Sequence, residues 1–332
     1  MGELYIVYAS DDRFAEILGV SLVSLYENNK LAENIIIYIL DSGISEENKN
    51  RIEEVSKYYM RDVPCWIKAK DVSKELQIDV SIDRGSLSQY ARLFVSSVLP
   101  ENLERVLYLD CDIIINQPIE ELWNLDMEGK TIAALMDAFS KWYRKNIELQ
   151  PNDIMFNSGV MLIDLKRWRE QKIEEDLLKF ILKKNGCIQQ GDQGVLNAIL
   201  SHNIKCFDPK FNAVTIFYDF SYDEMLIYRK PPKFYSREEV GNAVDNPVII
   251  HFTTSFLSCR PWNEGCQHKY VNRWLEYKLI SPWKDEKMWK NQKISGVQGI
   301  YKSFVKFLPR KLMIHISGIL QAYVRPIIRK IK

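Results

Sequence analysis

The sequence has no uninterrupted apolar run of about 18 residues, the length that a membrane-spanning helix requires. Its first residues read as a strand and not as a charged and apolar signal, so we expect a cytoplasmic protein. The six cysteines form no CxxC pair, which fits reduced thiols in a large fold. Cys259, Cys266 and His268 are residue types that bind zinc, but their spacing matches no common zinc site.

Glycine-rich phosphate-binding loops are also missing from the sequence. Neither a GxGxxG segment nor a Walker-type loop occurs, which disfavours a dinucleotide or ATP site of either kind. There is no internal repeat and no low-complexity stretch. The chain has 332 residues, of which 46% are hydrophobic, so it can bury a substantial core in one large domain or two modest ones.

Acidic residues are missing from the C-terminal end alone. After Glu286 there is no Asp or Glu but 11 Lys and Arg, which leaves 34 basic against 44 acidic residues in positions 1–286, a net charge of −10. We therefore expect an acidic body over residues 1–285 and a basic amphipathic tail over 286–332. Such a tail either lies on an anionic membrane surface or packs on the acidic body. Its apolar residues at helical spacing are Ile300, Phe304, Phe307 and Leu308, followed by Leu312, Ile316, Ile319 and Tyr323.

Strand-like segments alternate with helical ones along the body. This alternation predicts an α/β fold with parallel strands and helices on both faces of the sheet. Strands are expected over residues 4–9, 35–40, 65–69, 106–109, 131–136, 160–163 and 248–252. Helices are expected over 15–28, from Ser45 onward, and over 87–99, 165–183 and 192–200.

The segment LYLDCDIII, residues 107–115, places two carboxylates at the end of a strand that is otherwise apolar. Because side chains alternate along a strand, Asp110 and Asp112 point to one side and Cys111 to the other. Neighbouring carboxylates repel each other, and a hard cation with oxygen ligands relieves that repulsion. The carboxyl ends of strands are also where open α/β sheets bind ligands. The alternative is an acidic turn without a ligand.

The first strand ends in YASDDRF, residues 8–14. Asp11 can accept a hydrogen bond from a base or ribose, Arg13 can bind phosphate, and Phe14 can stack on a base. The alternative is a helix start that is rich in Asp. In SQYARL, Arg92 lies off the apolar stripe of the predicted helix, so its side chain is free to face the crevice at the carboxyl ends of the strands.

Six segments in this order resemble glycosyltransferase family 8, the retaining enzymes with a GT-A fold that use nucleotide sugars. The similarity is to its bacterial lipopolysaccharide α-galactosyl- and α-glucosyltransferases, and it runs from the first strand to about Trp283. The segments are YASDDRFA, SQYARL, LYLDCDIII, FNSGVMLIDLKRWR, QQGDQGVLNAIL, and IIHF followed by RPW.

The resemblance implies a mixed GT-A sheet flanked by helices, in a catalytic domain of residues 1–285, with a small C-terminal helical extension. It implies that Asp110, Asp112 and His251 hold Mn²⁺, with Mg²⁺ as the alternative. An imidazole ligand beside two carboxylates suits Mn²⁺ better than Mg²⁺.

The resemblance also assigns the residues that bind the donor. Uridine would be held by Asp11, Arg13 and Phe14, with Phe14 stacked on uracil. The family usually places a Gly after its metal-binding His and then Lys-Pro-Trp; here HFTTSFLSCRPW has no Gly, is longer, and offers Arg260 in place of Lys. The remaining donor contacts are Arg92 at the diphosphate or sugar, and Asp137, Asn157, Asp192 and Gln193 around the sugar ring, with Gln193 beneath the anomeric carbon.

The expected function is transfer of glucose or galactose from a UDP-sugar to a hydroxyl of a cell-envelope glycan or a glycosylated protein. A neutral Gln193 is a poor nucleophile, and Asp192 is expected to bind sugar hydroxyls, so we favour front-face attack over a covalent intermediate. A lipid-linked acceptor and peripheral contact with the inner face of the membrane are further expectations, and nucleic acid is not an expected partner. The alternatives are a DxD phosphotransferase and a non-catalytic sugar-nucleotide binder.

Overall fold

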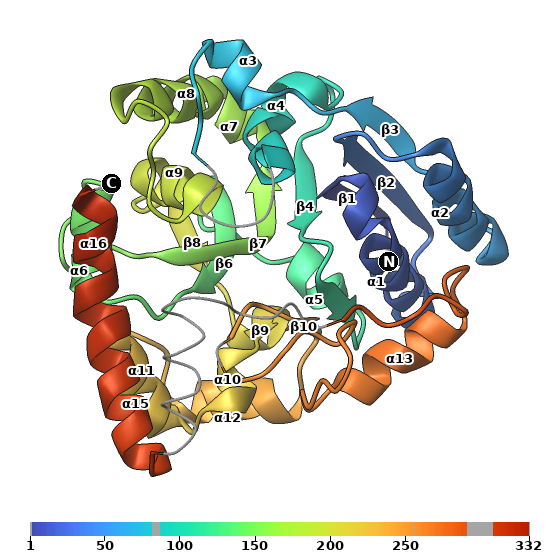
Figure 1. Cartoon of the computed structure of the whole chain (residues 1–332). Helices are drawn as coiled ribbons and strands as arrows, with labels where there is room; N and C mark the ends of the chain where they lie inside the picture. Colours follow the sequence, from blue (N-terminus) through green and yellow to red (C-terminus); the bar gives the residue numbers. More distant parts are fainter. Residues whose placement is uncertain (1, 82–86, 256, 291–307, 332) are drawn as a thin grey trace.

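The computed structural model describes residues 2–81, 87–255, 257–290 and 308–331. Its main feature is a seven-stranded sheet with the order β3-β2-β1-β4-β7-β6-β8 (Figure 1). The strands are β1 (Glu3–Ser10), β2 (Asn34–Asp41), β3 (Cys65–Lys68), β4 (Arg105–Leu109), β6 (Ile132–Met136), β7 (Phe156–Asp164) and β8 (Ile204–Cys206). β4 and β6 are buried along almost their whole length, which requires cover on both faces of the sheet.

Strand directions divide the sheet in two. β1, β2, β3 and β4 are parallel, as the alternation of strands and helices predicts. β7 runs antiparallel to both β4 and β6, so a fully parallel sheet is wrong and the mixed sheet is confirmed. The reason is the connection from β6 to β7, which carries the short helix α6 (Lys141–Asn146) and returns as a hairpin instead of crossing over the sheet.

Helices flank this sheet. The first, α1 (Ala15–Asn28), is buried nearly all round, and α2 (Glu46–Tyr58) begins at Ser45, whose side chain accepts from the Asn48 N–H as expected of an N-cap. The others in the body are α3 (Val72–Leu76), α4 (Val95–Val98), α5 (Glu120–Trp123), α7 (Leu165–Glu170), α8 (Ile173–Lys183), α9 (Gly191–Leu200), α10 (Ile216–Asp219), α11 (Tyr222–Arg229), α12 (Arg237–Asp245) and α13 (Val271–Leu279). Short 3₁₀ segments are η1 (Asp12–Phe14), η2 (Leu87–Phe94) and η3 (Pro209–Asn212).

Two predicted helices differ from the observed ones. The helix expected over 165–183 is two helices, α7 and α8, because Lys172 has a left-handed φ of 54° between them. The helix expected over 87–99 is the 3₁₀ segment η2 followed by α4. In a 3₁₀ turn, residues three apart share a face, and this geometry turns Gln89 and Arg92 toward the same cavity.

A second, three-stranded sheet lies beside the first, with the order β5-β10-β9. β5 (Ile113–Ile115) starts directly after Asp112, and β9 is Ala213–Val214. β10 (Ile249–His251), expected from its sequence as a strand, pairs antiparallel with β5 so that His251 lies opposite Ile113. The small sheet therefore brings a late histidine to the end of β4.

The C-terminal rod consists of α15 (Arg310–Ile319), the π-helical η4 (Leu320–Val324) and α16 (Arg325–Ile331), which Figure 1 shows in red at the edge of the molecule. It packs against α11 and α6. Arg310 forms an ion pair with Glu224, and the Ser140 hydroxyl donates to the Ala322 carbonyl at 2.7 Å. A Cβ at Gly318 would lie 2.5 Å from the Ile227 carbonyl oxygen, so the approach to α11 is close.

These contacts show that the described part of the tail packs on the acidic body, the second of the two expectations. Its outer side still exposes apolar residues: Leu312, Ile319, Leu320, Tyr323, Ile327 and Ile328. Of the first predicted stripe, Ile300, Phe304 and Phe307 lie outside the described residues, and Leu308 packs partly buried against the core. Among the helices that are described, none is long and apolar enough to cross a membrane.

Candidate active site

The turn that follows β4 carries both aspartates of the LYLDCDIII segment. The buried Cys111 thiol donates to the Ala9 carbonyl of β1 at 3.3 Å, and the Asp110 N–H donates to the Gly159 carbonyl of β7 at 2.7 Å. Cys111 thus anchors the turn to β1, and Asp110 and Asp112 are left facing the opposite side, as strand alternation predicts.

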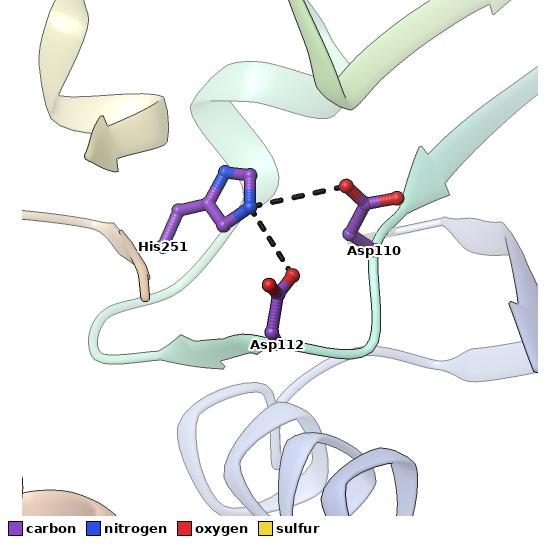
Figure 2. Close-up of side chains that lie close together, drawn as sticks. All are labelled: Asp110, Asp112 and His251. Carbon is purple, nitrogen blue, oxygen red and sulfur yellow. Dashed lines mark ion pairs between the residues drawn. The ribbon is translucent and has the colours of Figure 1, made fainter. Parts of the chain in front are cut away.

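His251 completes a cluster with the two aspartates (Figure 2). Its Nε2 lies 3.2 Å from Asp112 Oδ1 and 3.8 Å from Asp110 Oδ2. The pairing of β10 with β5 holds this arrangement, because the Phe252 N–H donates to the Asp112 carbonyl at 2.9 Å. One ligand atom from each of the three side chains lies within 4.8 Å of the other two.

The cluster fits a divalent cation that accepts oxygen and nitrogen ligands. Space is available on the β7 side because residue 159 is glycine. A Cβ at Gly159 would lie 2.3 Å from His251 Cε1 and 2.7 Å from Asp110 Oδ2, which no side chain could tolerate without displacing both ligands.

Two arginines pair with the aspartates. The buried Arg92 contacts Asp110 Oδ1 through Nη2 at 2.8 Å and Asp192 Oδ2 through Nε at 2.9 Å. Arg260 Nη2 lies 3.0 Å from Asp112 Oδ2. Burial alone would raise the pKa of Asp112, but Arg260 and His251 outweigh it and lower that pKa to about 2.

At Asp192, burial outweighs the nearby positive charge. Burial raises the pKa of Asp192 to about 6, since the repulsion from Asp110 adds to burial and Arg92 opposes both only in part. Asp192 and Gln193 occupy the first turn of α9, where Gln193 Oε1 accepts from the Ser158 N–H at 3.3 Å. They line a cavity of about 130 Å³ together with Gln89, Arg92, Asp110, Ser158 and Gln190.

Asp137 directly follows β6, and Asn157 is the second residue of β7. Both belong to the surroundings of the group formed by Asp110, Asp112 and His251, which is called the metal-type cluster below. Both are buried, and the Asn157 side chain donates to the Asp137 carboxylate, whose pKa burial raises. Asn157 Oδ1 accepts from the Gly159 N–H and from Asn212 Nδ2, at 3.0 Å each. Asn212 Oδ1 in turn lies 2.9 Å from His251 Nδ1. Asn212 could not be identified from the sequence, because a single Asn in a 3₁₀ turn has no motif.

The residues expected at the nucleoside lie after β1. Asp11 caps η1 by accepting from the Phe14 N–H at 3.3 Å, so its helix-start role is present. Phe14 packs edge-on against Trp262 and Trp289, with ring centroids 6.2 and 6.0 Å away, and Arg13 lies over the Trp289 ring.

Trp289 was also missed by sequence reasoning. Its N–H donates to the Trp262 carbonyl at 2.8 Å, and its carbonyl accepts from the Glu264 N–H. This links the segment after β1 to the loop that carries Arg260. Cys259, Cys266 and His268, whose spacing matches no common zinc site, do not form a metal-binding group: the Cys266 thiol donates to the Cys259 carbonyl at 2.9 Å, and His268 packs among aromatic rings. In the described part of the chain, Asp110, Asp112 and His251 are the one group that could hold a metal ion.

The mixed sheet and its carboxylate–imidazole cluster place the protein among α/β proteins that bind a ligand at the carboxyl ends of their strands. Residues 5–266 match the family described as Glycosyl transferase family 8, and the chain belongs to this family. The expected enzyme class, a glycosyltransferase, is therefore confirmed.

Relatives support the assignment over most of the chain. General stress protein A of Bacillus subtilis (strain 168) is 30% identical over 283 residues, which are 84% of this chain and 94% of that protein. Lipopolysaccharide 1,2-glucosyltransferase of Escherichia coli (strain K12) is 24% identical over 85% of this chain and 80% of that protein.

A solved structure supports the fold. The galactosyltransferase LgtC, in complex with donor and acceptor sugar analogs, superposes with a TM-score of 0.71 at 21% identity, covering 90% of this chain and all of that one. The GT-A fold expected from the sequence is confirmed by this likeness.

Proposed function

We propose that the protein is a metal-dependent, retaining hexosyltransferase that takes glucose or galactose from a UDP-sugar. The observation that carries the proposal is the Asp110–Asp112–His251 cluster, whose Asp110 also lines a cavity together with Asp192 and Gln193. The names of the relatives, a lipopolysaccharide glucosyltransferase and a galactosyltransferase, support a hexose donor. The acceptor is a hydroxyl of a cell-envelope glycan or a glycosylated protein.

Asp110, Asp112 and His251 would hold the cation, which we propose to be Mn²⁺ because one of the three ligands is an imidazole. When bound, the cation neutralises negative charge on the departing UDP. Arg92 and Arg260 border the same cluster and would bind the diphosphate oxygens, for which the planar guanidinium offers paired donors.

The nucleoside would lie against the segment after β1. We propose that Asp11 accepts from the ribose or uracil, that Arg13 contacts phosphate, and that Phe14 stacks on uracil. The edge contacts of Phe14 with Trp262 and Trp289 support this, because they fix the ring while leaving it half-exposed.

Asp137, Asn157, Asp192 and Gln193 would surround the hexose. Asp192 is engaged by Arg92 at 2.9 Å and is buried, which makes it a poor candidate for attack on the anomeric carbon. Gln193 is neutral. We therefore propose front-face attack: the acceptor oxygen bonds to the anomeric carbon as the bond to UDP breaks, and the acceptor proton passes to the departing phosphate.

The proposal is tested with Asp112→Asn, which removes a metal ligand and leaves the fold in place. In the parent, UDP with Mn²⁺ should raise the melting temperature, since ligands stabilise the state that binds them. Asp112→Asn should lose that rise and all sugar transfer, whereas the exposed Asp245→Asn should keep both. If the parent releases no nucleoside diphosphate from any UDP-, GDP- or ADP-sugar, whether Mn²⁺ or EDTA is present, the non-catalytic binder would be favoured.

The second alternative, a phosphotransferase, would use Asp110 as its nucleophile. Asp110 Oδ1 is instead held by Arg92 at 2.8 Å and accepts from the Tyr108 hydroxyl at 3.2 Å, which does not favour attack on phosphorus. Formation of a covalent phosphoenzyme on incubation with phosphate donors would reverse this preference.

We also propose that residues 1–285 form the catalytic domain and that the tail, residues 286–332, contacts the anionic inner face of the membrane. The exposed apolar side of the rod supports this, because Ile319 and Ile328 are exposed on it and so is the basic Lys311 at the start of α15. The full chain should sediment with anionic vesicles at low salt, and Ile319→Ser with Ile328→Ser should not. Equal sedimentation of both proteins would show that the rod is not the contact.

A further inference from the structure

Two buried asparagines connect the backbone of β7 to the imidazole of His251. Asn212 is fully buried in η3, and Asn157 lies on β7 with 8% of its surface exposed. Neither residue touches the two aspartates of the cluster through any contact found in the described residues. Their hydrogen bonds form a single line from Gly159 N–H through Asn157 and Asn212 to His251 Nδ1.

The position of Asn157 follows from a break in sheet register. β7 pairs with β6 as Ala134 with Met161, but the next residue of β6, Leu135, faces Asn157 where an unbroken ladder would place Val160. Of the β7 residues in between, Gly159 lies against His251 and Asp110, and Val160 stays paired with Leu109 of β4. The Asn157 side chain can therefore reach back to the N–H of Gly159 in its own strand.

The chemistry of the donors fixes the direction of this line. A backbone N–H can only donate, so the Asn157 atom that faces Gly159 is its oxygen. The same oxygen faces Asn212, which must therefore present its NH₂ group there. Asn212 then turns its own oxygen to His251, and an amide oxygen can only accept. In a neutral imidazole, this contact is a hydrogen bond only when the ring proton lies on Nδ1.

We propose that Asn212 is a positioning residue that holds His251 in the Nδ1–H tautomer and so keeps the Nε2 lone pair directed at Asp110 and Asp112. The inference deepens the proposed function, since it concerns the same cation site, and it rests on that function only for the identity of the ion. The tautomer is a property of the protein alone.

The other neutral tautomer, with the proton on Nε2, also has an acceptor in this site, so the contact from Asn212 decides between the two. Asp112 Oδ1 lies 3.2 Å from Nε2 and can also accept the ring proton, in competition with Asn212 Oδ1 at 2.9 Å from Nδ1. With the proton on Nε2, the imidazole would donate to Asp112 and could not bind a cation. The amide of Asn212 shifts this competition in favour of a free Nε2.

The first test leaves the hydrogen-bonded residues Asn157 and Asn212 unchanged. Ring-¹⁵N-labelled protein without added metal is examined by NMR, in which the two nitrogen shifts separate the two neutral tautomers from the charged ring. The chain has only four histidines, so His251→Gln identifies the signal. The Nδ1–H tautomer is the expected result at mildly alkaline pH, and an Nε2–H or a doubly protonated ring would overturn the proposal.

The second test replaces the amide. Asn212→Leu has a similar shape but no acceptor, and it should move the proton to Nε2 and weaken Mn²⁺ binding, measured by EPR without donor, by roughly 10- to 100-fold. Asn212→Asp keeps an acceptor at Nδ1 but loses the NH₂ that donates to Asn157, and the proton on Nδ1 should be retained. Asn197→Leu, at another fully buried Asn that bonds to the β7 backbone, controls for general loss of stability.

The outcomes separate this inference from the proposed function. A folded Asn212→Leu protein with the parent's tautomer and the parent's Mn²⁺ affinity would overturn the positioning role, even if the enzyme transfers sugar. The parent's Nδ1–H tautomer, its loss in Asn212→Leu and its retention in Asn197→Leu would support the role, even if the donor were not a UDP-sugar. If Asn212→Leu does not fold, the parent spectrum and the spectrum of Asn212→Asp still test the positioning role: an Nε2–H ring in either protein would overturn it.

Discussion

Replacing Gly159 by alanine should disable the cluster through a single methyl group. Unstrained carbon contacts lie at roughly 3.5 Å or more, but the new Cβ would be 2.3 Å from His251 Cε1 and 2.7 Å from Asp110 Oδ2. The imidazole must therefore move by about 1 Å, a displacement that can cost on the order of 100-fold in rate. Overpacking of this kind also costs roughly 1–3 kcal/mol of unfolding free energy.

The assay for Gly159→Ala combines Mn²⁺ titration with sugar transfer and denaturant unfolding. Gly241→Ala is the matched control, because a Cβ there meets nothing within 4 Å and the residue lies inside α12. That change should raise the unfolding free energy by up to about 1 kcal/mol, as Gly to Ala does in helices. A Gly159→Ala protein with unchanged Mn²⁺ affinity and activity would refute the placement of His251 and Asp110.

Three further changes test the surroundings of the cluster. Arg92→Met removes the arginine partner of the buried Asp192 and of the partly exposed Asp110, and should cost roughly 3–5 kcal/mol in denaturant unfolding. Asp192→Asn in the same chain should recover part of this; no recovery would mean that the Arg92–Asp192 pair contributes nothing to stability. Gln193→Ala should lower kcat far more than it raises the donor KM, the mark of an interaction made in the transition state, whereas a change in KM alone would make it a binding residue. Arg310 lowers the pKa of Glu224 to about 2 from an ordinary 4.5, so their pair stabilises the docked rod above about pH 4.5 and loses that effect as pH falls toward 2. Limited proteolysis should release the rod at acid pH, and Arg310→Gln should release it at neutral pH as well; a rod that stays protected in both would show that apolar packing suffices.

The sequence predicts the two aspartates of the cluster well, because strand periodicity is a local signal. Apolar residues up to Leu109 indicate a buried strand, and alternation then puts Asp110 and Asp112 on one side. The third member, His251, has no local signal. His251 was predicted as a metal ligand only from the family resemblance. In the structure, the antiparallel pairing of β10 with β5 places it next to the two aspartates.

Hydrogen-bond partners that lie far apart in the chain were beyond sequence reasoning. Asn212 and Trp289 have no periodicity and no motif, and their partners come from β7, β10 and the loop around Trp262. The helix predicted around Arg92 failed for a related reason. Its propensity favours an α-helix, but buried pairing with Asp110 and Asp192 accompanies a 3₁₀ turn that presents Arg92 inward.

The charges around the cavity explain why one site would serve both the cation and the donor. Asp110, Asp112 and an ionised Asp192 contribute three negative charges, and Arg92 and Arg260 contribute two positive ones, which leaves a local charge of −1. A divalent cation alone would change this to +1, and a doubly charged diphosphate alone would change it to −3. The two together return it to −1, so each reduces the electrostatic cost of binding the other. The pKa shifts agree in direction with this balance: burial and the repulsion from Asp110 raise the pKa of Asp192, with Arg92 opposing them only in part, whereas Arg260 and His251 outweigh burial and lower the pKa of Asp112.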